Sequence, residues 1–281
     1  ILRFANGASN YIFDGSNNNT TSQNLVIQNT NTTGAVVMFQ GTALNQGVRN
    51  TIFKNTIVKA GSNTAASYGI LVGGTTVGLS SGGIGHGNLL IENNDVYNTD
   101  YGVVISGSSV ANKVKQVTLR NNRIGTDSNA FFTRNNGVYL LNADSVLIEN
   151  NIIFNVKQSG AINNAGIWIA SGLTNSTIKR NVIKGIYSTS ASGYGAYGIN
   201  IASGTGVDND SIYNNLIYDI KTANYSTTST TWNAFGIRLA SGATNLKVYY
   251  NTIHLFGAPQ NGSSASSSAP LLILPGTYTG S

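Results

Sequence analysis

Cysteine is absent from the 281-residue sequence, and proline occurs only three times. The lack of cysteine excludes disulfide bonds and thiolate metal sites, but it leaves an extracellular location open. Charged residues make up 9% of the chain, against about 25% in ordinary soluble domains. Solubility must therefore come from Asn, Ser, Thr and Gly, a composition typical of β-rich secreted proteins. No apolar run reaches the roughly 18 residues that a membrane span needs.

The positive charge of the chain is small and spread along the sequence. Sixteen basic and ten acidic residues give a net charge of +6, and the densest basic groups are only pairs such as Lys113 with Lys115. A nucleic-acid-binding surface needs its basic residues in one stripe. We therefore expect no nucleic acid partner.

A sequence repeat in two halves recurs along the chain. The first half reads AGIWIASG at Ala165–Gly172 and FGIRLASG at Phe235–Gly242, and in the second half an apolar residue is followed three positions later by Asn, as in IENNII at Ile148–Ile153. The second half aligns seven asparagines in one column: Asn55, Asn94, Asn122, Asn151, Asn181, Asn215 and Asn251. The first half aligns six glycines: Gly69, Gly102, Gly137, Gly166, Gly198 and Gly236.

Both halves are short, alternate in polarity and are rich in β-branched residues, which indicates strands. One repeat cannot bury its apolar face alone, whereas stacked repeats can. Parallel strands in register lie about 4.8 Å apart, so each column would become a ladder. The asparagine amides would then face inward and bond to the turns above and below, because a buried amide without a partner is unfavourable by several kcal/mol.

The pattern xGIxIxxG…xIxxNxI, which extends from about Asn24 to Phe256, resembles the repeat of the pectate-lyase-like superfamily. The resemblance implies an all-β fold, a right-handed parallel β-helix of about eight or more turns with an internal Asn ladder. That superfamily contains lyases, glycoside hydrolases, phage tailspikes, adhesins and passive stalks, so the resemblance does not imply one activity. The Asn- and Ser-rich style is also similar to repeats in very large secreted surface proteins of Bacteroidetes-type bacteria.

One outward column follows the first apolar residue of each second half. It reads Phe53, Glu92, Arg120, Glu149, Lys179, Tyr213 and Tyr249. Opposite charges on neighbouring parallel strands attract each other. We therefore interpret the four charged residues as a surface row that fixes the register of the turns.

Two enzymatic hypotheses use the same charges. Glu92 and Glu149 would lie two turns apart, about 9–10 Å, near the upper limit for an inverting glycosidase, but Arg120 between them would keep both carboxylates ionised. A polyuronate lyase would need cations to neutralise the substrate carboxylate. Its candidate catalytic residues are Arg120, Arg123 and Lys179, with calcium held by Glu92, Asp95 and Glu149. In the lyases of the superfamily the acids cluster beside the basic residues, whereas here the charges alternate singly.

Two short elements are similar to motifs of polygalacturonases. GIGHG at Gly83–Gly87 and NTD at Asn98–Asp100 occur in the reverse order here, so we expect His86 to be a loop residue. VDND at Val207–Asp210 offers Asp208 and Asp210 as candidate metal ligands. Calcium is the only cofactor that the sequence suggests.

The second outward column consists of the residues two positions after each Gly of the glycine column, among them Tyr139, Trp168 and Arg238. Adjacent Tyr and Trp side chains on one face could form a platform for a sugar ring, or they could cover a loop. Together with the stacked tyrosines of the first column, they form the candidate ligand-binding set: Tyr139, Trp168, Arg238, Tyr213 and Tyr249.

The sequence favours a structural or adhesive β-solenoid module of an extracellular bacterial surface protein or filament that contacts glycans. The alternative is a carbohydrate-active enzyme, most plausibly a calcium-assisted polysaccharide lyase. No linker divides the chain, which predicts a single β-helix domain over 1–281. No cap precedes or follows the repeats, so we expect a segment of a longer chain whose neighbours are solenoid segments or copies of the same protein.

Overall fold

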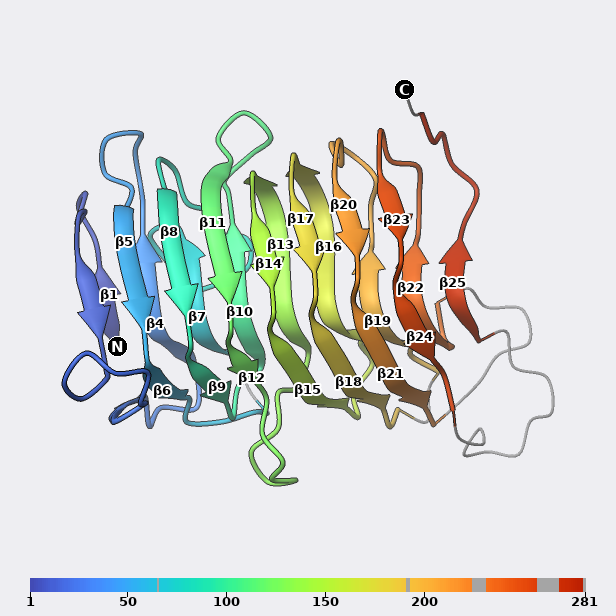
Figure 1. The fold of residues 1–281 in the computed structure, drawn as a ribbon, viewed down its shortest axis with the longest axis horizontal. Coiled ribbons are helices and arrows are strands. Elements are labelled where there is room, and N and C mark those ends of the chain that lie inside the picture. The colour runs from blue at the N-terminus through green and yellow to red at the C-terminus, as the bar shows by residue number, and fades with distance from the viewer. Residues whose placement is uncertain (65, 191–192, 224–230, 257–267, 280–281) are drawn as a thin grey trace.

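The computed structural model describes residues 1–64, 66–190, 193–223, 231–256 and 268–279, and these residues form 25 β-strands and no helix. The chain winds into a parallel β-solenoid in which each coil contributes one strand to each of three sides (Figure 1). The described strands complete eight coils, and β25 opens a ninth. The predicted all-β parallel solenoid of about eight turns is confirmed.

The strands of one side follow one another at every third position of the chain. The first side holds β1 (Leu2–Phe4), β4 (Gly34–Gln40), β7 (Ser67–Gly73), β10 (Tyr101–Ser106), β13 (Asn136–Asp144), β16 (Asn164–Thr174), β19 (Ala196–Ile201), β22 (Ala234–Leu239) and β25 (Ala269–Ile273). The second side holds β2 (Ile12–Asp14), β5 (Arg49–Lys54), β8 (Gly87–Glu92), β11 (Val114–Arg120), β14 (Leu147–Glu149), β17 (Thr177–Lys179), β20 (Ser211–Tyr213) and β23 (Lys247–Tyr249). The third side holds β3 (Leu25–Gln28), β6 (Thr56–Lys59), β9 (Asp95–Tyr97), β12 (Arg123–Ile124), β15 (Ile152–Gln158), β18 (Val182–Ser188), β21 (Leu216–Thr222) and β24 (Thr252–His254).

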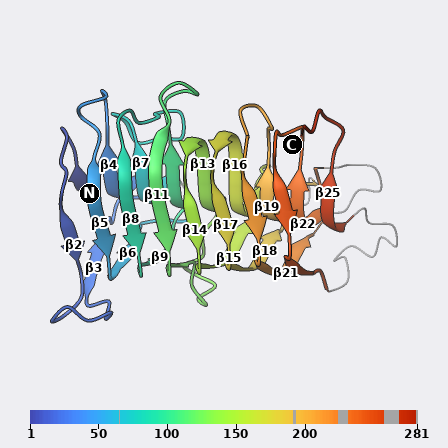
Figure 2. The ribbon, with the colours of Figure 1, turned by 45° about the horizontal axis from the view of Figure 1, so that its top comes forward.

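The three sides belong to two hydrogen-bonded sheets. The first and second sides form one 17-stranded sheet, joined where Val114 of β11 pairs with Ala143 of β13. The third side is a separate 8-stranded sheet. The strands of each side lie next to one another along the whole shaft, as Figure 2 shows. Among the described residues, no helix is long and apolar enough to cross a membrane.

The chain passes from the second to the third side through a two-residue turn, which explains the repeated Asn-Asn pairs. The first residue has a left-handed backbone, with φ of 51° at Asn93, 57° at Asn121 and 55° at Asn150. Asparagine adopts this conformation more readily than most residues that carry a side chain. The second residue of each pair then points into the shaft.

These inward asparagines form the predicted ladder. Each buried Oδ1 accepts hydrogen bonds from both the backbone N–H and the side-chain amide of the asparagine one coil earlier, as Asn151 does from Asn122 at 2.9 and 3.0 Å. The Nδ2 of Asn151 also donates to Leu119 O at 2.8 Å. The same pattern continues from coil to coil through five successive pairs of the column Asn94, Asn122, Asn151, Asn181, Asn215 and Asn251.

The first member of the predicted column requires a correction. The strand register pairs Lys54 with Glu92 and Ile57 with Asp95, so Thr56 rather than Asn55 aligns with Asn94. Both the backbone N–H and the hydroxyl of Thr56 donate to Asn94 Oδ1, at 3.0 and 2.8 Å. Asn55 occupies the left-handed position of the turn instead, with φ of 59°. The alignment by Ile-to-Asn spacing was therefore wrong by one residue in this coil.

The glycine column lies where the first side approaches the third most closely. A Cβ built on Gly137 would lie 2.3 Å from Cγ2 of Ile153 and 2.7 Å from Gly166 O. No side chain fits at such a distance, so glycine is required by packing rather than by its backbone angle. The remaining interior is one continuous cluster of Ile, Leu and Val side chains, which runs from Val36 in the second coil to Leu239 in the eighth.

Candidate functional site

The charged row of the second side is longer than predicted. Neighbouring strands align it, in order, as Asp14, Lys54, Glu92, Arg120, Glu149 and Lys179, followed by Tyr213 and Tyr249. Phe53 is not a member, because it is fully buried in the core and Lys54 takes its place. This is the same one-residue correction as at Asn55. The alternation of charge therefore covers six strands.

The row resolves into ion pairs between adjacent coils. Lys54 lies 3.1 Å from Asp14, Arg120 lies 2.7 Å from Glu92, and Lys179 lies 3.4 Å from Glu149. Each cation thus faces a carboxylate of its neighbouring strand. The predicted alternation of charge along the row is confirmed, and the row offers no cation that is free to neutralise a substrate.

The three candidate lyase cations do not converge. Arg120 and Lys179 lie on the second side, whereas Arg123 lies beyond the Asn turn on the third side. Arg123 pairs with Asp95 at 3.8 Å and with Asp127 at 3.6 Å. The proposed calcium ligands Glu92, Asp95 and Glu149 are the partners of these cations, so they are likewise divided between two sides.

The five candidate ligand-binding residues are also divided between two sides. Tyr139 and Trp168 are half-buried neighbours on the first side, and Arg238 belongs to the same column. Arg238 is only 6% exposed and donates a hydrogen bond to Asn200 Oδ1 at 3.0 Å. Tyr213 and Tyr249 stack on the second side with ring centroids 4.9 Å apart. These residues form no single site.

Asp208 and Asp210 lie close to Asp144 and Lys113 rather than around a vacant centre. Lys113 carries the favourable charge interaction with all three carboxylates. Asp210 is 2% exposed, and its Oδ1 accepts the backbone N–H of Ser176 at 2.8 Å. Burial raises the pKa of Asp210 to about 7. Among the described residues, no group of three or more His, Asp or Glu side chains is arranged to hold a metal ion.

His86 is buried and joins two coils. Its Nδ1 accepts the Val48 N–H at 3.2 Å, and its Nε2 lies 2.9 Å from Gly73 O, so Nε2 carries the proton. Burial lowers the pKa of His86, which keeps the ring neutral. The residue has a structural role between loops, in agreement with the prediction.

A groove on the third side gathers residues that the sequence did not single out. It has a volume of about 420 Å³ and lies between β15, β18, β21 and the loop that follows β12, which projects from the shaft in Figure 1. The floor consists of Asn155, Gly185 and Asp219, which have left-handed backbones with φ of 52°, 62° and 57°. Asn155 holds the loop through hydrogen bonds to Thr126 O and Ser128 O at 2.7 and 3.1 Å.

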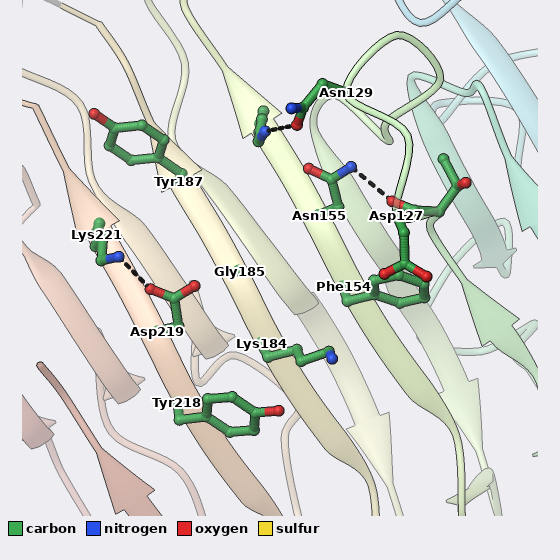
Figure 3. A pocket seen from close by; sticks show the side chains of 12 residues that line it. Asp127, Asn129, Phe154, Asn155, Lys184, Gly185, Tyr187, Tyr218, Asp219 and Lys221 are labelled. Carbon is green, nitrogen blue, oxygen red and sulfur yellow. Dashed lines mark hydrogen bonds and ion pairs between the residues drawn. The ribbon is translucent and has the colours of Figure 1, made fainter.

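Aromatic and lysine side chains alternate on both sides of this floor. One row across the three strands reads Phe154, Lys184 and Tyr218, and the other reads Lys157, Tyr187 and Lys221. Each lysine therefore has an aromatic residue on the neighbouring strand, in a checkerboard of three rings and three cations. In Figure 3 the Tyr187 and Tyr218 rings lie apart, with the Asp219 carboxylate between them.

The three lysines of the checkerboard differ in their partners. Lys221 forms an ion pair with Asp219 at 2.5 Å, and Lys157 donates to Asn129 Oδ1 at 2.6 Å. The Lys184 ammonium lies 5.5 Å from the centroid of the buried Phe154 ring. Within the described residues it has no hydrogen bond and no ion pair. The groove thus contains a cation that is not neutralised by a carboxylate.

The groove had a signal in the sequence. Three segments that follow the ladder asparagines, IIFNVKQ, VIKGIYS and LIYDIKT, carry an aromatic residue and a lysine three positions apart. The checkerboard appears only when these three segments are aligned with one another. The sequence alignment of the repeats stopped at the Asn turn that precedes them.

Comparison with known proteins identifies the repeat. A family model described as the right-handed β-helix region matches residues 84–253. Among solved structures, the chain is similar to the full-length tailspike protein 2 of an Escherichia coli O157:H7 bacteriophage, with a TM-score of 0.49, 15% identity, and coverage of 88% of this chain and 33% of the tailspike. It is also similar to the enzymatically active domain of tailspike protein 2 from bacteriophage CBA120, with a TM-score of 0.48, 16% identity, and coverage of 88% and 37%. The chain spans about a third of the length of both. No curated protein matches the sequence.

Proposed function

The chain belongs to the right-handed β-helix family, and on that premise we propose that it is a structural or adhesive module of an extracellular bacterial surface protein or filament. The third side of the shaft contacts a polysaccharide in this proposal. The observation that carries it is the groove on β15, β18 and β21, an open surface of alternating aromatic and lysine side chains on a continuous solenoid.

The shaft is built to keep its outer residues in fixed positions. The Asn ladder and the aliphatic cluster run through the same coils that carry the groove. Side chains at equivalent positions therefore repeat at the strand spacing, about 4.8 Å along the axis. A surface of this kind suits the repeated contacts that a polymer offers.

The groove also has the chemistry of a sugar-binding surface. Tyr187 and Tyr218 are half-buried and line the groove. Aromatic rings pack against the apolar faces of sugar rings, and carboxylates and amides accept hydrogen bonds from sugar hydroxyls. Asp127, Asp219 and Asn129 supply such acceptors on the same surface.

The alternative is a calcium-assisted polysaccharide lyase. Its candidate catalytic and calcium-binding residues already form ion pairs with one another. Seven of the ten carboxylates of the chain form ion pairs, and the other three surround Lys113. Asp210, whose pKa is raised to about 7 by burial, lies in the interior where no polysaccharide reaches it. We therefore rank the binding function above the enzymatic one.

Affinity electrophoresis tests the proposal. The purified chain is run in native gels that contain alginate, polygalacturonate, xylan or dextran, with serum albumin as the mobility reference. We expect at least one polysaccharide to retard the chain. Failure of all of them to retard it would contradict the glycan contact. Release of unsaturated uronate from alginate or polygalacturonate in the presence of calcium, measured by ultraviolet absorbance, would favour the lyase instead.

Neighbouring solenoid segments or copies of the same protein are part of the proposal. The last described strand exposes residues of the core columns: Ile273, the neighbour of Leu239, is 56% exposed, and Leu271, the neighbour of Ile237, is 43% exposed. Parallel strands at such positions present unpaired backbone groups together with core residues. A further coil placed against them would bury both.

A further inference from the structure

We propose that the groove on the third side selects an acidic polysaccharide, with Lys184 as the residue that binds the anionic group. This inference rests on the proposed glycan contact and names its chemical class. Tyr218 would contact the sugar ring next to the charged contact, and Tyr187 would contact the ligand from the other side of the floor. The ligand chain would run along the solenoid axis, across the three strands.

Charge in the groove favours an acidic ligand over a neutral one. Three lysines and two aspartates line it, which leaves one positive charge in excess. Asp219 is neutralised by Lys221, and Asp127 lies 3.6 Å from Arg123. Lys157 and Lys184 therefore have no carboxylate partner. Lys157 is held by Asn129 Oδ1, whereas the Lys184 ammonium has only the Phe154 ring as its partner. A carboxylate or sulfate would supply the missing partner through a charge-assisted hydrogen bond.

The positions of the rings define the direction of the ligand. Lys184 and Tyr187 lie on β18, and Tyr218 is the neighbour of Lys184 on β21. Gly185 leaves the floor between them low, because it has no side chain, and its left-handed φ of 62° suits glycine. A chain that crosses from β18 to β21 therefore passes from Lys184 directly to Tyr218, and Tyr187 lies across the low floor at Gly185.

A single-stranded nucleic acid is the competing anionic polymer. Its phosphates would also pair with lysine, and its bases stack on aromatic rings. However, Asp127 and Asp219 line the same groove as hydrogen-bond acceptors, and the phosphodiester backbone of single-stranded DNA has no hydroxyl groups to donate to them. The same carboxylates accept hydrogen bonds from sugar hydroxyl groups. The mixture of cations and hydrogen-bond acceptors therefore fits an acidic glycan better.

The main test compares two lysine substitutions of equal charge. Lys184→Ala removes the proposed contact, whereas Lys247→Ala removes an exposed lysine from β23 on the second side. Affinity for alginate is measured by isothermal titration calorimetry. We expect Lys184→Ala to weaken binding about tenfold, the equivalent of one charge-assisted hydrogen bond, and Lys247→Ala to leave it unchanged. Circular dichroism melts of both variants verify that each is folded.

Asp219→Asn supplies a test of opposite sign. Asparagine tolerates the left-handed backbone at this position, where φ is 57°. The substitution frees the Lys221 ammonium and removes a negative charge, so alginate should bind more tightly and the gain should shrink as salt is raised. A neutral ligand would instead meet a neutral amide oxygen in place of a charged acceptor and would not bind more tightly.

The outcomes separate the inference from the proposed function. Retardation by dextran or xylan that is insensitive to Lys184→Ala would overturn the acidic-ligand inference and leave the glycan contact in place. No binding of any polysaccharide would overturn both. Binding of oligo(dT) through Lys184, with no binding of alginate, would assign the groove to nucleic acid and contradict the inference.

Discussion

The inner and outer surfaces of the same three coils use polar residues in opposite ways. Inside, Asn151, Asn181 and Asn215 exchange hydrogen bonds so completely that each Oδ1 has two donors and each Nδ2 has carbonyl and amide acceptors. Outside, three residues past each of these asparagines, the checkerboard leaves the Lys184 ammonium without an anionic partner. Only three residues along the chain separate the two positions, but every polar group of the inner ladder has a hydrogen-bond partner, whereas the outer groove contains an unpaired ammonium.

This difference separates what holds the fold from what is available to a ligand. A buried polar group without a partner destabilises the folded state, so the interior column can tolerate no gap. An ammonium at the surface stays hydrated, so the absence of an anionic partner hardly lowers the free energy of unfolding. Substitutions inside should therefore change the free energy of unfolding, and substitutions in the groove should change binding.

The largest expected effect comes from opening the interior ladder. Asn151→Leu removes the side-chain acceptor of the Asn122 N–H and a side-chain donor to Leu119 O. At about 1–3 kcal/mol for each of these two lost bonds, we expect a loss of about 2–6 kcal/mol in the free energy of unfolding. Urea denaturation followed by circular dichroism measures it.

The adjacent residue is the matched control for this substitution. Asn150 is exposed and has a left-handed φ of 55°, which glycine adopts without strain. Asn150→Gly should therefore change stability by less than about 1 kcal/mol. Equal losses in the two variants would show that the turn, rather than the ladder, stabilises the coils.

The second prediction concerns an interior position where the polar pattern is incomplete. Asp210 lies in a buried column beside Ser176, and its Oδ2 has no hydrogen-bond partner. Burial raises its pKa from 3.8 to about 7. Between pH 3.8 and pH 7, Asp210 is therefore protonated in the folded state and ionised in the unfolded state. The contribution of Asp210 to stability is therefore full below about pH 4 and declines until about pH 7.

An amide at this position removes the ionisation. Asp210→Asn should raise the free energy of unfolding at pH 8 by about 2–4 kcal/mol and flatten its dependence on pH between 4 and 7. Asp208→Asn, a substitution of the same type two residues away, should keep most of that dependence, because burial rather than the Asp208 charge is the main cause of the raised pKa of Asp210. Thermal melts at a series of pH values provide the comparison, and a flat wild-type profile would refute this reading of Asp210.

The smallest effect is expected from the charged row of the second side. Glu149→Ala removes the partner of Lys179 and Arg180, at 3.4 and 2.6 Å, whereas Glu92→Ala removes the partner of Arg120 alone. Glu149 is 9% exposed, but its partner Arg180 is largely exposed, and ion pairs that reach solvent contribute about 0–1 kcal/mol each. We therefore expect a loss of about 1 kcal/mol for Glu149→Ala and less for Glu92→Ala in urea denaturation. A loss larger than that of Asn151→Leu would mean that the outer charged row contributes more to stability than the inner ladder, contrary to this account.

Sequence reasoning predicted those features that the period of the repeat determines. The ladder from Asn94 to Asn251 and the alternation of Glu92, Arg120, Glu149 and Lys179 follow directly from stacking one phrase on the next. The prediction failed at Asn55 because the spacing of an Asn from an apolar residue does not distinguish the left-handed position of the turn from the inward one. Both positions accept asparagine, and only the strand register separates them.

The candidate site was harder to predict than the fold. Tyr139 and Trp168 are neighbours as expected, but they lie on the first side while Tyr213 and Tyr249 lie on the second. Alignment of one column shows which residues are neighbours along the axis and not how the three sides face one another. The groove was missed because it also depends on the loop after β12, whose path over β15 is fixed by Asn155 and not by the repeat.

The most direct measurement of the central claim is a crystal structure of the chain with an alginate oligosaccharide. The account predicts the oligosaccharide on the third side, with a carboxylate within hydrogen-bond distance of Lys184 Nζ and sugar rings against Tyr187 and Tyr218. An oligosaccharide bound on the first side against Tyr139 and Trp168, with the third side empty, would contradict it.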